Sequence, residues 1–399
     1  MGSAAFPSAA GGTTPGAPSV LEARIDLAAV AHNTRVIAEL IGKRQLMAVV
    51  KADGYGHGAV EVAQVMLANG ADQLGVARLA EALELRRAGI TAPILAWIWT
   101  PDEDFSAALD QQVDLAVLSP AHARAIVASG RRARVTVKVE TGMHRSGVDE
   151  ADWAEVFGLL RDCPNITVTG LMSHFACADE PGNPANARQI ARFRAAIARA
   201  RTMGLEVPVN HLSNTPATLA LPEARFEMVR LGAALYGLST LSPHPTMGGE
   251  SAEATQPYRV EAQLRPAMSW VGLVTKIKPL AAGEGTSYGL SWRAPADGYL
   301  AVIPAGYADG VQRSWQGKFS VTIDGEAYPQ VGRVCMDQHL VFLGENPNGV
   351  AVGDEAVIFG SGGWSASTLA AHVGTVNYEV VCAPHGRTQR RYFTGGQCA

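Results

Sequence analysis

Short apolar runs alternate with longer runs rich in alanine, leucine and arginine over the first 240 residues of the chain. The apolar runs have the length of strands, and the runs between them have the pattern of helices, so the alternation predicts βαβ units. After a leading segment at 23–26 and a helix near 28–41, strands are expected at 45–51, 73–77, 93–99, 113–118, 134–140, 166–174, 206–212 and 226–231. Eight such strands predict a (β/α)8 barrel, and a miscount of one strand would not change that class.

Residues 239–262 are rich in proline and glycine and interrupt this alternation. Beyond them the apolar runs are short, at 268–278, 300–304, 319–323, 328–331, 339–343 and 356–359, and turn residues follow two of them. This pattern is typical of a mostly antiparallel β domain. The first twenty residues are dominated by small residues and proline. They have neither the charged start nor the sustained apolar stretch of a signal peptide. We therefore expect a flexible tail over 1–20, a barrel over 21–250 and a β domain over 251–399.

Composition narrows the classes of partner. The 399 residues include 47% hydrophobic and 18% charged residues, as in a globular protein, and the net charge of −4 gives no basic footprint for nucleic acid. No window approaches the roughly 18 consecutive apolar residues of a membrane span. The five cysteines are odd in number and scattered, so neither a disulfide framework nor a metal site is expected. Small-molecule partners and a reducing cytoplasm are the simplest expectation.

A lysine stands where a buried strand meets a glycine-rich turn. The apolar run 46–50 ends at Lys51, and glycines follow at 54, 56 and 58. An amine that leaves a buried strand is partly desolvated, which lowers its pKa and allows it to form a Schiff base or to act as a base. The alternative is a solvated lysine at a strand end, which is the more common situation.

Other polar residues follow the same edge of the predicted barrel. Active sites of such barrels lie at the C-terminal ends of the strands, and phosphate often binds after the last two. The segment 213–216 is typical of a helix N-terminus with a hydroxyl donor, and 230–233 lets the backbone approach an anion. Capping alone would also explain Asn214 and Thr215. Lys51, Arg145, His174 and Arg230 all fall at this edge. Together with Lys51, the two loops suggest a phosphorylated cofactor that is bound covalently.

Six segments together resemble the signatures of alanine racemases. They are 51–58, 137–145, 170–174, 229–232, 285–289 and 335–337, in the family's order, and the resemblance extends from about 21 to 393. It implies a two-domain, fold-type III pyridoxal 5'-phosphate enzyme that acts on alanine as a head-to-tail homodimer with shared active sites. The barrel and the β domain were inferred independently of it.

The resemblance assigns two bases. Lys51 matches the lysine that holds the cofactor and serves as one base, and Tyr288 of the partner subunit matches the other. Inversion needs bases on opposite faces, because a single group would tend to restore the original configuration. Tyrosine has a pKa near 10, so a cation must favour its phenolate or a relay must remove its proton. Arg145 and His174 match the positions that do this.

The remaining roles follow from the same resemblance. Arg230 matches the arginine that faces the pyridine nitrogen, and His211 is expected to orient it, unless it is only a histidine buried on a strand. The expected phosphate ligands are Tyr55, Asn214, Thr215, Gly232, Ala233 and Tyr378. Arg145 and the backbone of Met336 would hold the substrate carboxylate, and Tyr307 would line the opening. Lys138, beside Arg145, matches a position that can be carbamylated in the family; the alternative is an ordinary ion pair with Glu140.

Three functions remain open at this point. The first is an alanine racemase that supplies D-alanine for peptidoglycan. The second is a racemase or decarboxylase of the same fold type with a broader or different amino-acid substrate, and the third is a non-catalytic carrier of the cofactor. The β domain with Tyr288 argues against a carrier. Residues 382–390 depart from the family's usual ending, which affects only how the C-terminus is expected to pack.

Overall fold

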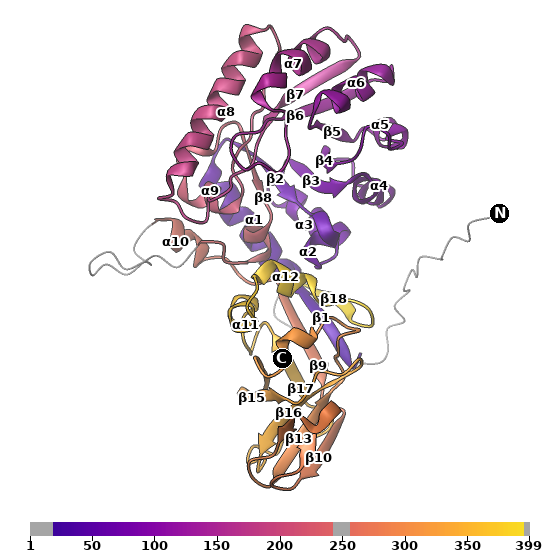
Figure 1. Cartoon of the computed structure of the whole chain (residues 1–399), viewed down its shortest axis with the longest axis vertical. Helices are drawn as coiled ribbons and strands as arrows, with labels where there is room; N and C mark the ends of the chain where they lie inside the picture. Colours follow the sequence, from indigo (N-terminus) through magenta and orange to yellow (C-terminus); the bar gives the residue numbers. More distant parts are fainter. Residues whose placement is uncertain (1–18, 242–255, 395–399) are drawn as a thin grey trace, which may run out of the picture.

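The computed structural model describes residues 19–241 and 256–394. Figure 1 shows an elongated molecule, with the barrel and its helices at one end and the β domain at the other. The expected tail lies almost wholly outside the described residues, and so does most of the expected boundary near residue 250. No helix within the described ranges combines the length and the apolar content needed to cross a membrane.

Seven parallel strands form the barrel, in the order β7-β6-β5-β4-β3-β2-β8. They are β2 (Gln45–Val49), β3 (Gln73–Arg78), β4 (Ile94–Ile98), β5 (Asp114–Val117), β6 (Ala133–Lys138), β7 (Ile166–Met172) and β8 (Met228–Leu231). Helices surround them: α1 (Leu27–Ile41), α2 (Lys51–Tyr55), α3 (Ala59–Ala68), α4 (Leu79–Arg87), α5 (Ser106–Asp110), α6 (Pro120–Ala128), α7 (Trp153–Arg161), α8 (Pro184–Thr202) and α9 (Thr215–Ala220). The predicted alternation is confirmed in these strands.

The expected strand at 206–212 is wrong as a regular strand. Only an isolated bridge pairs His211 with Met172, because Pro208 has no N–H to donate and the Asn210 side chain, rather than a backbone carbonyl, accepts the N–H of Leu171 at 3.1 Å. The segment nevertheless lies between β7 and β8. Its backbone bonds both neighbours, including Val209 N–H to Thr169 at 3.0 Å, and so closes the barrel.

A small apolar layer fills the barrel interior, as barrels of this size require. It consists of Met47, Leu95, Ala116, Met172 and Met228, all buried. Met172, one residue of this layer, also lines the cavity at the C-terminal ends of the strands.

The second domain is built on a nine-stranded sheet, ordered β10-β13-β16-β15-β14-β17-β9-β1-β18. Its strands are β1 (Leu21–Asp26), β9 (Met268–Leu273), β10 (Lys276–Leu280), β13 (Gly298–Ile303), β14 (Ser320–Ile323), β15 (Glu326–Val331), β16 (His339–Gly344), β17 (Glu355–Phe359) and β18 (Gln389–Phe393). A short hairpin adds β11 (Gly285–Thr286) and β12 (Trp292–Arg293). All described pairs except β1–β18 are antiparallel, as expected. The sequence analysis missed β18 and the helices α11 (Ala366–Val373) and α12 (Asn377–Cys382).

Strand β1 belongs to this sheet and not to the barrel. It pairs antiparallel with β9 and parallel with β18, although it was expected to lead into the barrel domain. The chain therefore starts in the β sheet and passes directly into α1, where the Asp26 carboxylate caps the helix by accepting the N–H of Ala28 at 2.8 Å. Helix α10 (Gln256–Glu261) follows the barrel on the way back.

Candidate active site

A cavity of about 750 Å³ opens at the C-terminal ends of the barrel strands, a volume typical of small-molecule sites. Ten of its lining residues were predicted as catalytic or cofactor-binding: Lys51, Tyr55, Arg145, His174, Asn214, Thr215, Arg230, Gly232, Ala233 and Tyr378. Lys138 lines it as well. A second hollow of about 510 Å³ lies near the opposite ends of the strands, around Asp114 and Arg134, and contains none of the predicted residues.

The charge of the lining is one-sided. Four cationic side chains face the cavity, Lys51, Lys138, Arg145 and Arg230, while no aspartate or glutamate is among the described residues that line it. Such a cavity favours a ligand with several negative charges, because no carboxylate in the described lining balances these cations. A phosphorylated cofactor together with an amino-acid carboxylate meets this requirement.

Lys51 starts a turn of unusual conformation. Ala52, Asp53, Gly54 and Tyr55 all have left-handed φ angles, of 52°, 52°, 62° and 54°, so α2 is a left-handed turn rather than an ordinary helix. Left-handed backbone costs a residue with a side chain roughly 1–2 kcal/mol. The glycines predicted a turn here, but nothing in the sequence indicated that three other residues share this conformation.

The environment of Lys51 suits a base or a nucleophile. Burial, and then the charge of Arg145, lowers the pKa of Lys51 from its usual 10.5. The thiol of Cys382 lines the same cavity, and burial raises its pKa, so it is held as the thiol. The sequence analysis did not single out Cys382, because no spacing marks a lone cysteine that reaches a site from another domain.

Arg230 is buried, and both of its terminal nitrogens donate to neutral groups. Its Nη1 donates to the His211 carbonyl at 2.7 Å and to His211 Nδ1 at 3.2 Å, and its Nη2 donates to the Ser173 carbonyl at 2.6 Å and to His174 Nδ1 at 3.2 Å. Burial lowers the pKa of Arg230 to about 10, so it stays cationic at neutral pH. Burial and then the charge of Arg230 depress the pKa of both His174 and His211, which keeps their Nδ1 atoms available as acceptors.

The other end of the cavity offers neutral donors. Tyr55 lies so close to Gly232 that a Cβ at Gly232 would come within 2.2 Å of the Tyr55 hydroxyl. Burial raises the pKa of Tyr55 above its ordinary value and that of Tyr378 to about 12, so both phenols keep their protons. Asn214 caps α9 by accepting the N–H of Ala217 at 3.2 Å, and the Thr215 hydroxyl lies beside it. These groups fit a phosphate without adding negative charge.

Lys138 occupies the wall next to Arg145. It is buried and donates to the Ser146 hydroxyl, and burial followed by the charges of Arg145 and Arg230 lowers its pKa to about 8. Glu140 does not serve it as a hydrogen-bond partner. The Glu140 carboxylate accepts backbone N–H groups from the turn after it, including that of Met143 at 2.8 Å.

Four predicted residues do not line the cavity of their own chain: His211, which lies against Arg230, and three residues of the β domain. Tyr288, Tyr307 and Met336 belong to the β domain and are 68%, 40% and 53% exposed. Tyr288 starts a short 3₁₀ helix (Tyr288–Leu290), and Tyr307 donates its N–H to the Cys335 carbonyl at 3.1 Å, next to Met336. One chain therefore brings together the barrel residues but leaves these three on a separate exposed face.

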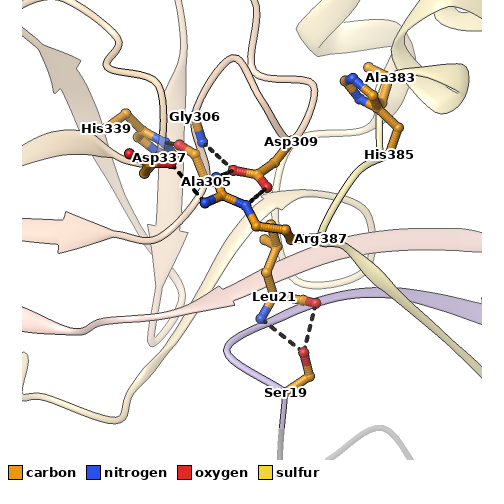
Figure 2. A network of polar contacts seen from close by, with 10 residues as sticks. All are labelled: Ser19, Leu21, Ala305, Gly306, Asp309, Asp337, His339, Ala383, His385 and Arg387. Atoms are coloured by element: carbon orange, nitrogen blue, oxygen red, sulfur yellow. Dashed lines mark hydrogen bonds and ion pairs between the residues drawn. The ribbon is translucent and has the colours of Figure 1, made fainter. Parts of the chain in front are cut away.

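An arginine fork fixes the loops that carry two of them. Figure 2 shows Arg387 reaching both oxygens of Asp309 at 2.8 Å, and Asp337 at 2.7 Å. Asp309 also accepts the N–H of Gly306 at 3.0 Å. Tyr307 directly follows Gly306, and Met336 directly precedes Asp337. The charge-assisted network therefore restrains the two loops that carry these residues.

Two family models match the chain in succession. The model described as alanine racemase, N-terminal domain, matches residues 25–240, and the model described as alanine racemase, C-terminal domain, matches residues 267–392. Together they cover both the barrel and most of the β sheet.

Individual proteins match over nearly the full length. The chain is 57% identical to an alanine racemase of Corynebacterium efficiens, over 95% of this chain and all of the relative, and 47% identical to one of Mycobacterium tuberculosis, over 95% and 97%. A crystal structure of alanine racemase from Corynebacterium glutamicum has a TM-score of 0.82 and 50% identity, and covers 94% of this chain and all of that one. One from Streptomyces lavendulae has a TM-score of 0.86 and 40% identity, over 96% and 99%.

Proposed function

The chain belongs to the alanine racemase family, and on that premise we propose that its active site combines the barrel cavity of one subunit with the exposed β-domain face of another. It is an isomerase that interconverts L-alanine and D-alanine with pyridoxal 5'-phosphate, and so supplies D-alanine for peptidoglycan. The observation that carries the assignment of the site is the group of four cations in the cavity, Lys51 and three others, with no carboxylate in the described lining.

Different residues of the cavity are proposed to bind the two ends of the cofactor. Pyridoxal phosphate, when bound, supplies an electron-withdrawing ring that makes the α-proton of an attached amino acid removable. Lys51 would hold it covalently, and the phosphate would take donors from Tyr55, Asn214, Thr215, Gly232, Ala233 and Tyr378. Arg230, oriented by His211, would offer only donors to the ring nitrogen and so disfavour protonation of that nitrogen. This limits electron withdrawal and disfavours side reactions such as transamination.

Two bases on opposite faces would invert the α-carbon. Lys51, with its lowered pKa, exchanges a proton on one face, and Tyr288 of the partner subunit exchanges a proton on the other. Arg145 holds the substrate carboxylate and, as a cation, favours the phenolate. His174 stays neutral and can accept a hydrogen bond, so it contributes through a relay rather than through charge. The backbone of Met336 and the ring of Tyr307, both of the partner subunit, would complete the carboxylate site and its opening.

A head-to-tail homodimer follows from the same arrangement. The exposure of Tyr288, Tyr307 and Met336 supports it, because an arginine network restrains the loops of two of the three although none of them lines the cavity of its own chain. We place the enzyme in the cytoplasm. The four described cysteines are free thiols, which suits a reducing compartment.

Borohydride reduction of the purified holoenzyme, followed by mass mapping, tests the assignment of Lys51. We expect a reduced cofactor adduct on Lys51 and its loss in Lys51→Ala. Lys138 lines the same cavity and serves as an internal control, so an adduct found there would contradict the assignment. Separation of alanine, serine, lysine and arginine enantiomers after incubation then measures substrate breadth.

A further inference from the structure

The left-handed turn after Lys51 needs restraint from elsewhere in the structure. Ala52, Asp53 and Tyr55 carry side chains in a backbone region that residues other than glycine seldom adopt. Such a conformation persists only where surrounding contacts impose it. Within the barrel, Glu81 accepts the N–H of Ala52 at 2.7 Å, which restrains the start of the turn but not its middle.

Strand β18 supplies contacts to the rest of the turn. Figure 1 shows the yellow β18 and α12 at the junction of the two domains, near α2. Arg390 Nη1 forms an ion pair with Asp53 Oδ2 at 2.5 Å, and its Nε donates to the Gly56 carbonyl at 2.8 Å. Two positions further on, Tyr392 lies against Gly58, where a Cβ would come within 1.9 Å of its hydroxyl. Alternate residues of a strand share one face, so Arg390 and Tyr392 face the turn together.

Arg390 thereby restrains the turn on both sides of Tyr55. Asp53, its ion-pair partner, also accepts the N–H of Ala59 at 2.8 Å through its other oxygen, which links the turn to α3. Gly56 is the first residue after Tyr55. A single guanidinium therefore holds the residues that flank the phenol, and Asp53 itself lies two residues after Lys51.

We propose that Arg390 is a positioning residue for the cofactor-binding turn. It is not among the residues that line the cavity; it acts through Asp53 and Gly56 to hold Lys51 and Tyr55 in a geometry that already fits the cofactor. The proposal rests on the proposed function of Lys51. Preorganisation of a binding loop raises affinity by reducing the ordering that binding must otherwise impose.

An ordinary surface ion pair is the alternative. The Arg390 and Asp53 side chains are 34% and 48% exposed, and pairs of that exposure often add little to stability. The two explanations differ in where the effect appears. A surface pair would leave the turn and cofactor affinity unchanged, whereas a positioning residue alters both more than it alters global stability.

The test compares Arg390→Ala and Arg390→Lys with Arg391→Ala. Arg391 is the neighbour on the same strand and lies 3.7 Å from Glu22, away from the turn, so it is a matched control. Hydrogen exchange of the amides of 52–58 is measured in the apoprotein, and pyridoxal phosphate is titrated into each variant. We expect Arg390→Ala to accelerate exchange in the turn and to weaken cofactor affinity by about tenfold, with Arg390→Lys in between, because lysine keeps the charge but not the second bond.

The outcomes separate cleanly. Arg391→Ala should remain within about twofold of the parent in both measurements. Unchanged turn exchange and affinity in Arg390→Ala, or an equal loss in Arg391→Ala, would overturn the proposal. If Arg390→Ala does not fold, Asp53→Asn removes the same ion pair and is measured identically. Exchange in the apoprotein does not depend on Lys51 chemistry, so failure of borohydride labelling at Lys51 would reject the proposed function and still leave the restraint of the turn to be decided.

Discussion

Mixed dimers test whether two subunits share each site. Lys51 lies in the barrel cavity, whereas Tyr288 of the same chain is 68% exposed on the β domain and lines no part of that cavity. We expect Lys51→Ala and Tyr288→Phe enzymes to be nearly inactive alone. Loss of a positioned acid or base costs roughly 10²–10⁴ in rate, and loss of the covalent lysine costs more. Tyr288→Phe removes only the hydroxyl and keeps the exposed ring.

Subunit exchange should restore a defined fraction of the activity. In a head-to-tail dimer each site takes its barrel residues from one chain and its β-domain residues from the other, so a mixed dimer has one site lacking both bases and one site intact. Random exchange of equal amounts makes about half of the dimers mixed. Each mixed dimer has one intact site of two, so recovery should approach about a quarter of the wild-type rate.

A control pair shows that recovery requires this arrangement. Lys51→Ala and Arg145→Ala both alter the barrel cavity, so every site of their mixed dimer is defective and no activity should return. Racemisation is followed by chiral chromatography, and native mass spectrometry verifies exchange. Absence of recovery in the Lys51→Ala and Tyr288→Phe mixture, despite verified exchange, would refute the shared site and place both bases in one chain.

Two further predictions concern the cavity wall. The amine of Lys138, with its pKa of about 8, becomes neutral as pH rises, and only the neutral amine attacks CO₂, forming an N–C bond and releasing a proton. At constant dissolved ¹³CO₂, a carbamate NMR signal should therefore grow between pH 7 and 9 and disappear in Lys138→Met; a signal that does not change with pH contradicts this. Gly232→Ala should weaken cofactor binding by about tenfold, because its Cβ would displace the Tyr55 hydroxyl, whereas Gly182→Ala, with open space around it, should bind normally. Equal affinities in a titration would show that Tyr55 does not need its present position.

The sequence predicts the barrel strands well because their signal is local. Each is an apolar run bounded by residues that break strands, so β2 to β6 are placed within a few residues. The pairing of strands into sheets is harder to predict, because the six residues of β1 do not indicate which strands β1 will pair with. The expected strand at 206–212 failed for an identifiable reason: Pro208 lacks a donor, and an asparagine side chain substitutes for the backbone. The pattern of apolar residues alone predicts neither the missing donor nor the side-chain hydrogen bond.

The candidate site divides in the same way. Lys51 and His174 follow barrel strands and Arg230 lies near the end of β8, and topology alone collects such residues at one edge. Their individual roles were predicted from the resemblance to the family, because the spacing of residues along the chain does not give the distances and orientations of their side chains. The left-handed turn, Cys382 and Arg390 were missed. Arg390 contacts a residue 334 positions earlier in the chain, and no local pattern can indicate such a contact.

Contacts between the two domains explain why neither half of the site is independent of the β sheet. Strand β1 pairs with β9 and β18 and continues into α1, where the buried Asn33 donates to the Arg265 carbonyl and accepts the Arg265 N–H, both at 2.8 Å. The sheet is thus bonded to the barrel through the first and the returning crossings of the chain. Through β18 it reaches the turn of Lys51. Tyr288 lies in the separate β11–β12 hairpin of the same domain, where the hydroxyl of the preceding Ser287 donates to the Arg333 carbonyl at 2.7 Å. In the proposed dimer, the β domain would therefore position both the lysine of its own barrel, through β18, and the tyrosine offered to another subunit, through the β11–β12 hairpin.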